Sequence, residues 1–206
     1  MSIKELLAGV QENVLMSEHT TFKIGGPAKY FYIADTKEKI FNALKAARDC
    51  GLPYFVLGQG SNVLISDRGF SGLVIKFLNT KYKIPRPTSP LAQSKAGGQD
   101  ASIVADAGVP LSLLVSMAAG AGLSGLEWLA GIPGTLGGAI YGNAGAYGHS
   151  ISELIESVEA IEVESEKLKV KNYFKKDCKF GYRDSIFKHQ PAVILSAKLK
   201  LQKGDP

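Results

Sequence analysis

Hydrophobic and polar positions along the first 77 residues predict a small α/β unit. Residues 29–34, 53–58 and 73–77 are rich in aromatic and β-branched side chains, which is typical of strands. A segment with helical periodicity separates the first two of these strands, and residues 3–10 favour a short opening helix. Strand, helix and strand in this order indicate a mixed α and β fold.

The predicted helix between those strands has its own start and stop signals. Asp35 and Glu38, three residues apart, are expected to form a capping box at its start. Gly51 stands where a helix would stop. The residues predicted to share its buried face are Ile40, Leu44 and Ala47.

The second half of the chain predicts more strands and a second helix. Residues 102–108 are expected to form a strand, followed by an apolar helix with Pro110 as its first residue, buried nearly all round. Residues 157–164 and 167–174 flank an acidic turn and predict a hairpin. Residues 192–202 alternate apolar with polar side chains, which predicts a half-buried strand.

Residues 79–100 interrupt these patterns. They contain three prolines and two adjacent glycines without any hydrophobic period, which predicts an exposed, mobile insertion. We therefore expect an α+β chain with a first domain over residues 1–72 and a second over 73–206 that carries the insertion.

Composition narrows the class of protein. The chain has 206 residues, of which 45% are apolar and 21% charged, so it is a globular protein. Its formal charge of +5 suits anionic small molecules such as nucleotides. Nucleic acid is a weaker alternative, because basic and aromatic residues are not interleaved.

Cysteine and histidine positions argue against metal or redox chemistry. Cys50 and Cys178 lie far apart and are expected to be reduced, buried thiols. The three histidines lack metal-ligand spacing, so no metal site is predicted. The N-terminal residues do not read as a signal peptide, and no stretch has the length of a membrane span, so we expect a cytoplasmic protein.

The first candidate for chemistry is VLGQGSNVLISD, residues 56–67. Gly58 and Gly60 in a turn after a strand allow successive N–H groups to point inward and form an anion site. Val63 takes the place of the third glycine of a dinucleotide-binding fingerprint, so the motif is not of that kind. An ordinary tight turn is the alternative.

The second candidate is GIPGTLGGAIYGNAGAYG, residues 131–148, in which seven of eighteen residues are glycine. Large apolar residues interleave with the glycines and no charge occurs, so the stretch is expected to be ordered backbone packed closely against a chain segment or a flat ligand. Asn143 suits either a left-handed φ or the polar edge of a ring. A glycine-rich packing corner without a ligand is the alternative.

The third candidate lies in residues 175–190, just before the last strand. Tyr182, Arg183, Ser185 and Lys188 form a polar cluster. An arginine there can bind a carboxylate or phosphate through two hydrogen bonds, and a lysine adds a point charge. A solvated basic face is the alternative.

Taken together, four motifs resemble one family. In order they are TTFKIGGPAKYF, VLGQGSNVLISD, GLEWLAGIPGTLGGAIYGNAGAYG and CKFGYRDSIFK. They are similar to those of the UDP-N-acetylenolpyruvoylglucosamine reductases of bacterial peptidoglycan synthesis. The resemblance covers nearly the whole chain apart from the insertion.

The resemblance implies a fold and a cofactor. It implies two α+β domains of the vanillyl-alcohol oxidase/PCMH type with FAD bound between them, and a third, substrate-closing domain. The residues that it implies for the cofactor are Gly58, Gln59, Gly60, Ser61, Asn62, Ile132, Pro133, Gly134, Thr135, Gly137, Gly138, Asn143 and Gly145.

It also implies a reaction. NADPH reduces the flavin, which then delivers hydride to the enolpyruvyl group of UDP-N-acetylglucosamine enolpyruvate, giving UDP-N-acetylmuramate for the cell wall and hence for cell shape and division. Arg183 matches the catalytic arginine, Tyr182 a substrate-contact tyrosine, and Lys188 is assigned to substrate binding, whereas Ser185 is expected only to support them.

One departure limits this resemblance. The serine proton donor and the late glutamate of the family have no match after Lys188, so the chain is expected to lack the third domain. A non-catalytic flavin-binding module is therefore an alternative. A sugar oxidase with covalently attached flavin is a weaker one, because residues 58–62 contain no histidine.

Overall fold

The computed structural model describes residues 2–78, 80–84, 101–164 and 167–204. The chain divides into two compact units. The first consists of Met1–Asn79 with Ile161–Val170 and Pro191–Val193, and the second consists of Thr80–Ala160, Lys171–Gln190 and Ile194–Pro206. The predicted insertion at residues 79–100 lies mostly outside the described residues, although residues 82–83 form a short strand.

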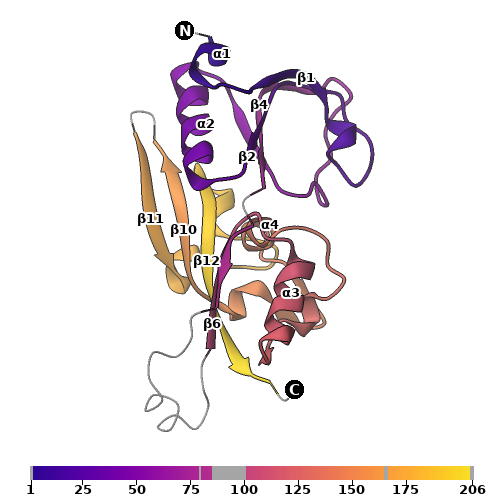
Figure 1. The fold of residues 1–206 in the computed structure, drawn as a ribbon, viewed down its shortest axis with the longest axis vertical. Coiled ribbons are helices and arrows are strands. Elements are labelled where there is room, and N and C mark those ends of the chain that lie inside the picture. Colours follow the sequence, from indigo (N-terminus) through magenta and orange to yellow (C-terminus); the bar gives the residue numbers. More distant parts are fainter. Residues whose placement is uncertain (1, 79, 85–100, 165–166, 205–206) are drawn as a thin grey trace. The chain divides into compact units, whose positions relative to one another are not determined.

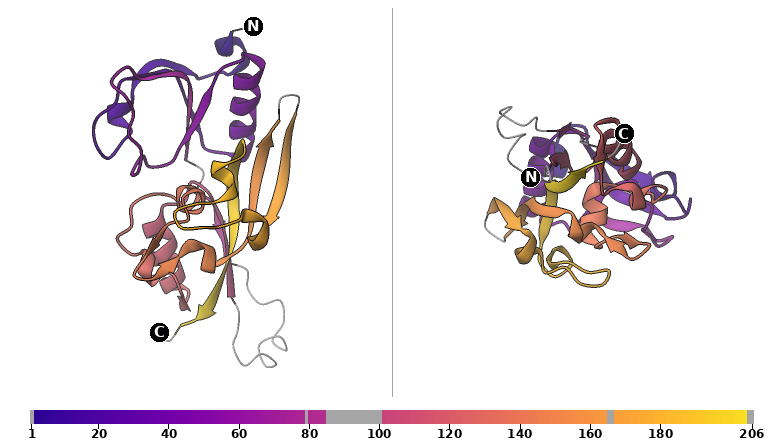
Figure 2. Two further views of the ribbon diagram at one scale, coloured as in Figure 1. Left: turned by 180° about the vertical axis from the view of Figure 1, so that it is seen from behind. Right: turned by 90° about the horizontal axis from the view of Figure 1, so that it is seen from below.

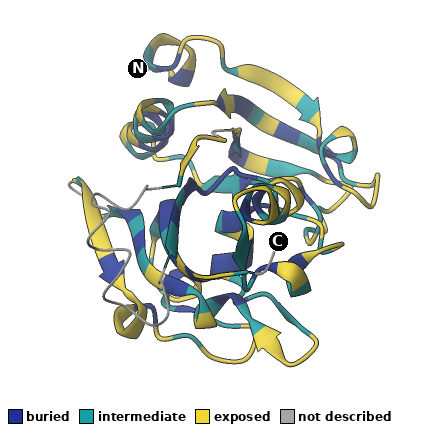
Figure 3. Ribbon diagram, turned by 60° about the horizontal axis from the view of Figure 1, so that its bottom comes forward, coloured by how far each residue is buried: buried dark blue, intermediate teal, exposed yellow. Residues whose placement is uncertain are grey.

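The first unit is built on a four-stranded sheet in the order β1-β2-β4-β3 (Figure 1). The β2–β4 and β4–β3 pairs are parallel, whereas β1 is antiparallel to β2. β1 is exposed along most of its length, as the strand after the N-terminal helix in Figure 3 shows. The elements are α1 (Ile3–Leu6), β1 (Gln11–Leu15), β2 (Pro27–Ala34), α2 (Lys37–Asp49), β3 (Tyr54–Leu57) and β4 (Phe70–Phe77).

Helix α2 contacts β2 and β4 (Figures 1 and 2). The predicted face of Ile40, Leu44 and Ala47 is confirmed, because all three side chains are fully buried. The predicted capping box is wrong. Thr36 caps the helix by accepting a hydrogen bond from the Lys39 N–H at 3.1 Å. The Asp35 side chain pairs instead with the Lys39 ammonium, because one residue more of extended backbone precedes the first helical turn.

The second unit contains the sheet β11-β10-β12-β6-β5, with β7 beside β12. The expected hairpin is confirmed, since β10 and β11 are neighbours. The elements are β5 (Tyr82–Lys83), β6 (Ala101–Asp106), α3 (Leu111–Gly120), β7 (Leu123–Ser124), α4 (Leu136–Tyr141), β8 (Gly145–Ala146), β9 (His149–Ser150), β10 (Ile155–Val163), β11 (Leu168–Phe174) and β12 (Ala192–Lys203).

One burial prediction in this unit is confirmed in part and another is wrong. The alternation predicted for β12 is present from Ala197 to Gln202, but residues 193–197 are buried without alternation. Helix α3 is not buried all round. Pro110 is its N-cap and not its first residue, and only Leu111, Leu114 and Ala118 are buried.

The units also divide at a different place from the predicted boundary at residue 72. That boundary falls inside β4, which pairs with both β2 and β3 and so belongs to the first unit. The end of the β10–β11 hairpin is grouped with the first unit as well. Such a non-contiguous division depends on long-range pairing, which local patterns do not encode.

Two further expectations can be compared with the described residues. Cys178 is buried as predicted, and burial raises the pKa of its thiol to about 11, but Cys50 is only partly buried. Within the described part of the chain, none of the helices has both the length and the apolar character needed to cross a membrane.

Candidate functional site

The first predicted loop, residues 58–62, follows β3 directly. The carboxyl ends of parallel strands are the usual place for ligands in such sheets. Gly60 adopts φ +72°, and a Cβ on it would overlap the carbonyl oxygen of His19. The Thr21 N–H donates to the Gly60 carbonyl at 3.1 Å. Close packing against its own chain is therefore one reason for glycine at position 60.

Residues 67–69, a few positions after this loop, also run close to residues 26–27. A Cβ on Gly26 would overlap the carbonyl oxygen of Asp67, and one on Gly69 would overlap that of Pro27. The Gly26 N–H donates to the Ser66 carbonyl at 2.9 Å. Three glycines therefore let residues 58–69 run closely along residues 16–27.

Two basic side chains beside this loop were not predicted. Lys76 lies opposite Leu57, the residue before Gly58, and takes part in no ion pair or hydrogen bond with the rest of the described chain. His19 stacks on Phe31 with ring centroids 4.4 Å apart. Burial lowers the pKa of Lys76. The pKa of His19 is lowered mainly by burial and, to a smaller extent, by the positive charge of Lys76. The ammonium group of Lys76 at this end of the sheet suits an anion.

In the second unit, the prediction that residues 131–148 are ordered is confirmed, although their short helix α4 was not predicted. Thr135 caps α4 by accepting from the Gly138 N–H at 3.4 Å. The Gly137 N–H donates to the Ala107 carbonyl at 2.8 Å. A Cβ on Gly137 would lie 2.7 Å from the Cβ of Ala107, so this glycine is held against the chain itself.

Other glycines of the stretch have open space. No heavy atom lies within 4 Å of a Cβ built on Gly131 or Gly148, although both have φ +84°. Gly138 would meet only the hydroxyl of Thr135, at 3.6 Å. Crowding therefore does not explain these glycines, and their backbone is open to a ligand.

Three hydrogen bonds join this stretch to the third predicted motif. The Asn143 side chain donates to the carbonyl of Gly181 at 2.7 Å. The Arg183 guanidinium donates from Nη2 to the carbonyl of Gly145 at 2.7 Å. The buried Ser185 hydroxyl donates to the carbonyl of Tyr141 at 2.8 Å, which is the supporting part expected of it. The two motifs therefore form one structure.

A cavity of about 490 Å³ lies where these motifs meet, and its volume suits a small molecule. Arg183 adopts a left-handed φ of +52°, and its guanidinium lies over the Tyr182 ring, 5.7 Å from the ring centre. Tyr182 is 93% exposed. The cavity is lined by Asn143, Gly145, Ala146, Tyr147, Gly148, His149, Ser150, Gly181, Tyr182 and Arg183.

Lys188 lies beside the cavity and does not line it. Its ammonium donates to the carbonyl of Arg183 at 2.6 Å and lies 5.8 Å from the centre of the Tyr141 ring. This hydrogen bond holds the backbone of Arg183 in its left-handed conformation. Its predicted contact with a substrate stays a prediction.

Six of the ten lining residues were not among the predicted site residues, and Tyr147 and His149 are two of them. Tyr147 was counted only among the large residues of the glycine-rich stretch, yet it is 88% exposed and adopts φ +53°. His149 was judged only as a metal ligand. Its spacing of four residues from Glu153 was the available signal, because such pairs meet on a helical turn.

Comparisons with known proteins agree with this geometry. A model of the FAD binding domain family matches residues 28–170. A UDP-N-acetylenolpyruvoylglucosamine reductase of Clostridium tetani is 40% identical over 197 residues, covering 95% of this chain and 59% of the relative. The chain therefore spans about three fifths of the length of that relative.

Solved structures give the same result. The UDP-N-acetylenolpyruvylglucosamine reductase of Thermus caldophilus superposes with a TM-score of 0.70 at 33% identity, over 94% of this chain and 63% of that one. A cholesterol oxidase of B. sterolicum shares the fold alone, with a TM-score of 0.61 at 14% identity over 94% of this chain and 37% of that one.

The predicted fold class is thereby confirmed as an α+β FAD-binding fold of the PCMH type. The chain is similar to UDP-N-acetylenolpyruvoylglucosamine reductases over nearly its whole length. It belongs to the family of FAD-binding domains.

Proposed function

We propose that the chain binds FAD and carries the flavin site and the catalytic arginine for the NADPH-dependent reduction of UDP-N-acetylglucosamine enolpyruvate to UDP-N-acetylmuramate. The observation that supports this most is the cavity in which Arg183, held by Gly145, lies beside Tyr182 and Asn143. The same reaction would assign the protein to peptidoglycan synthesis in the cytoplasm.

The residues of each unit fit parts of the cofactor. In the first unit, residues 58–62 offer main-chain groups at the carboxyl end of β3, near the ammonium of Lys76, which suits a pyrophosphate. In the second unit, the open backbone at Gly131 and Gly148 leaves room for a flat ring system. We propose that these residues hold FAD, together with the remaining predicted positions between 132 and 145.

Bound FAD would supply the hydride chemistry. Arg183 would supply charge. A guanidinium carries five N–H donors, and among the described residues only the Gly145 carbonyl accepts from that of Arg183. The remaining donors can bind a substrate carboxylate and stabilise the negative charge that develops there when hydride adds to the neighbouring double bond.

The structure fixes Arg183 in three ways. Gly145 accepts from its side chain, Lys188 donates to its carbonyl, and the ring of Tyr182 lies against the guanidinium. A cation that is already in place needs little reorganisation in the transition state. We propose that Tyr182 and Lys188 contribute to substrate binding through this cation.

The visible absorption spectrum of the purified chain tests the cofactor. We expect yellow protein, or apoprotein that takes up one FAD per chain. Titration of the FAD-loaded chain with UDP-N-acetylglucosamine enolpyruvate tests the part of Arg183, with Arg183→Gln expected to raise the Kd at least tenfold. Arg48→Gln, on α2 of the first unit, is the control. A chain that binds FAD but not the UDP-sugar is a non-catalytic flavin module, and a chain that never binds FAD contradicts the whole proposal.

A further inference from the structure

His149 is a lining residue of the cavity whose side chain the proposed reaction does not use. It begins β9 and lies opposite Ala146 in the β8–β9 pair. It shares the cavity with Arg183 and Tyr182. The side chain is 56% exposed, so a bound molecule can reach it.

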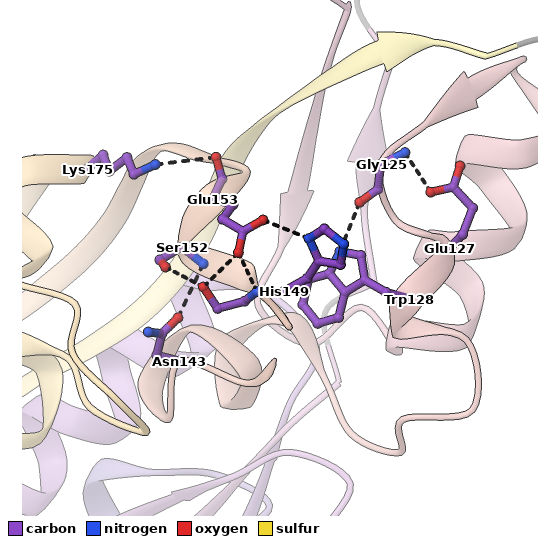
Figure 4. A network of polar contacts seen from close by, with 9 residues as sticks. Gly125, Glu127, Trp128, Asn143, His149, Ser152, Glu153 and Lys175 are labelled. Atoms are coloured by element: carbon purple, nitrogen blue, oxygen red, sulfur yellow. Dashed lines mark hydrogen bonds and ion pairs between the residues drawn. The ribbon is translucent and has the colours of Figure 1, made fainter. Parts of the chain in front are cut away.

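Two contacts hold the imidazole ring. Its Nδ1 lies 3.0 Å from Oε2 of Glu153, in the 3-10 turn η4 (Ile151–Glu153), and Glu153 also accepts from the Ser150 N–H at 2.9 Å. The ring stacks on Trp128 at 6.1 Å between centroids, and the Trp128 indole N–H donates to Gly125 at 3.0 Å. Figure 4 shows His149 between Glu153 and Trp128.

These contacts decide which ring atom can serve a ligand. The hydrogen bond from His149 lowers the pKa of the Glu153 carboxyl group, so Glu153 is a carboxylate and accepts the proton of Nδ1. No described residue bonds to Nε2. A protonated imidazole donates from both ring nitrogens, so that Nδ1 serves Glu153 and Nε2 serves a ligand.

We propose that His149 is an anion-binding residue of this cavity, donating from Nε2 to an anionic oxygen of the substrate, and that Glu153 positions it. This inference rests on the proposed function. A UDP-sugar enolpyruvate carries two such groups, the diphosphate and the carboxylate. Arg183 and His149 line one cavity and offer N–H donors to such a ligand.

The test measures substrate affinity of the FAD-loaded chain, from the change in flavin absorbance and in fluorescence of Trp128, the single tryptophan. His149→Phe keeps a ring beside Trp128 and removes Nε2. Because a charge-assisted hydrogen bond is lost, we expect its Kd to rise about ten- to a hundredfold. FAD content and near-ultraviolet circular dichroism should stay as in the wild type.

His189→Phe is the matched control. His189 also pairs with a carboxylate, that of Asp184 at 2.9 Å, and is similarly exposed, but it does not line the cavity. We expect its Kd to stay within twofold of the wild type. An equal loss in both variants, or none in His149→Phe, overturns the proposal, as does a loss of FAD affinity in place of substrate affinity.

A double-mutant cycle tests the role of Glu153. Glu153→Gln should weaken substrate binding in the wild type and have no further effect in His149→Phe, because it acts only through the imidazole. Equal effects in both backgrounds contradict that role, since a merely structural carboxylate would matter in either.

Two ligands distinguish the anionic group. UDP-N-acetylglucosamine has the diphosphate but lacks the enolpyruvyl carboxylate. If His149→Phe weakens both ligands equally, the diphosphate is the partner, and if it weakens only the enolpyruvyl ether, the carboxylate is. A wild-type chain that holds FAD and binds neither ligand overturns the proposed function and this inference together. Binding of both ligands without any effect of His149→Phe overturns only the inference.

Discussion

The two glycine-rich regions of the molecule look alike in sequence and differ in structure. In the first unit, Gly26, Gly60 and Gly69 stand where one segment crosses another so closely that a Cβ would overlap a backbone oxygen. In the second unit, Gly137 and Gly145 are also crowded by the chain, but Gly131 and Gly148 have open space around the position of a Cβ. Crowding by the protein itself thus explains the glycines of the first unit but not Gly131 and Gly148.

This difference changes what a glycine-rich stretch implies about a cofactor. A glycine at a backbone crossing is required whether or not a ligand binds, so it carries little information about function. A glycine with space around it leaves a surface that a ligand can approach. The second unit therefore provides the sharper test of the proposed cofactor contacts.

The largest effect is expected for Gly60→Ala. Its Cβ would overlap the His19 carbonyl, and φ +72° adds backbone strain. Strain and overpacking each cost about 1 to 3 kcal/mol, so we expect the free energy of unfolding to fall by about 3 kcal/mol or more. Urea unfolding of the apoprotein measures it.

Gly51→Ala is the control for that change. Gly51 also has a left-handed φ, +62°, but no atom lies within 4 Å of its Cβ position. The free energy of unfolding of Gly51→Ala should fall by the cost of the backbone strain alone, about 1 kcal/mol. If both variants lose the same stability, the crossing at Gly60 is not tight and the comparison between the two regions breaks down.

A smaller loss is expected for Gly137→Ala in the second unit. The new methyl group would lie 2.7 Å from the Cβ of Ala107, and overpacking of this kind costs about 2 kcal/mol. Ala107→Gly in the same chain removes that methyl and should restore part of the loss. The free energies of unfolding of both single variants and the double variant give the coupling. Strictly additive losses would show that the two residues do not compete for space.

How far the sequence predicts this fold depends on how local each feature is. The buried face of α2 was predicted because its residues recur at the helical period. Its cap was missed because Asp35 and Thr36 are both common capping residues, and only the backbone angles separate them. The continuous burial of residues 193–197 was missed because it depends on tertiary packing, which local patterns do not encode.

The candidate site shows the same limit. The glycine-rich stretch and the YRDS motif were each singled out from the sequence, but as separate candidates. Their connection is made by pairs such as Arg183 and Gly145, which are 38 residues apart. His149 was missed for a similar reason, because its spacing from Glu153 indicates only that pair and not its place beside Trp128 and in the cavity.

Asn143→Ala tests the connection between these two motifs. Asn143 has φ +42°, donates to Gly181 and accepts from the Ser152 N–H at 3.3 Å. Losing these buried hydrogen bonds should cost about 1 to 2 kcal/mol in thermal or urea unfolding. Asn143→Gly separates the effect of the backbone angle from that of the hydrogen bonds, because glycine adopts a left-handed φ without strain but makes neither hydrogen bond. Equal stability of Asn143→Gly and the wild type would mean that only the backbone angle matters.

The smallest effect on stability, and the most informative one, is expected for Gly138→Ala. Gly138 lies in α4 with an ordinary helical φ, and a Cβ on it meets only the Thr135 hydroxyl at 3.6 Å. The change should shift the free energy of unfolding by less than about 1 kcal/mol, because alanine favours a helix more than glycine does.

Gly138→Ala should weaken the binding of FAD, although it changes the stability of the protein little. If the cofactor packs against this glycine, as proposed, the added methyl group should raise the Kd for FAD at least tenfold in a fluorescence titration, a penalty of about 1.4 kcal/mol. Gly120→Ala, in α3 of the same unit and equally free of neighbours, should leave that Kd unchanged. Unchanged FAD affinity in both variants would remove Gly138 from the cofactor site. The left-handed φ of +84° at Gly131 and Gly148 would then be the remaining reason for glycine at those two positions.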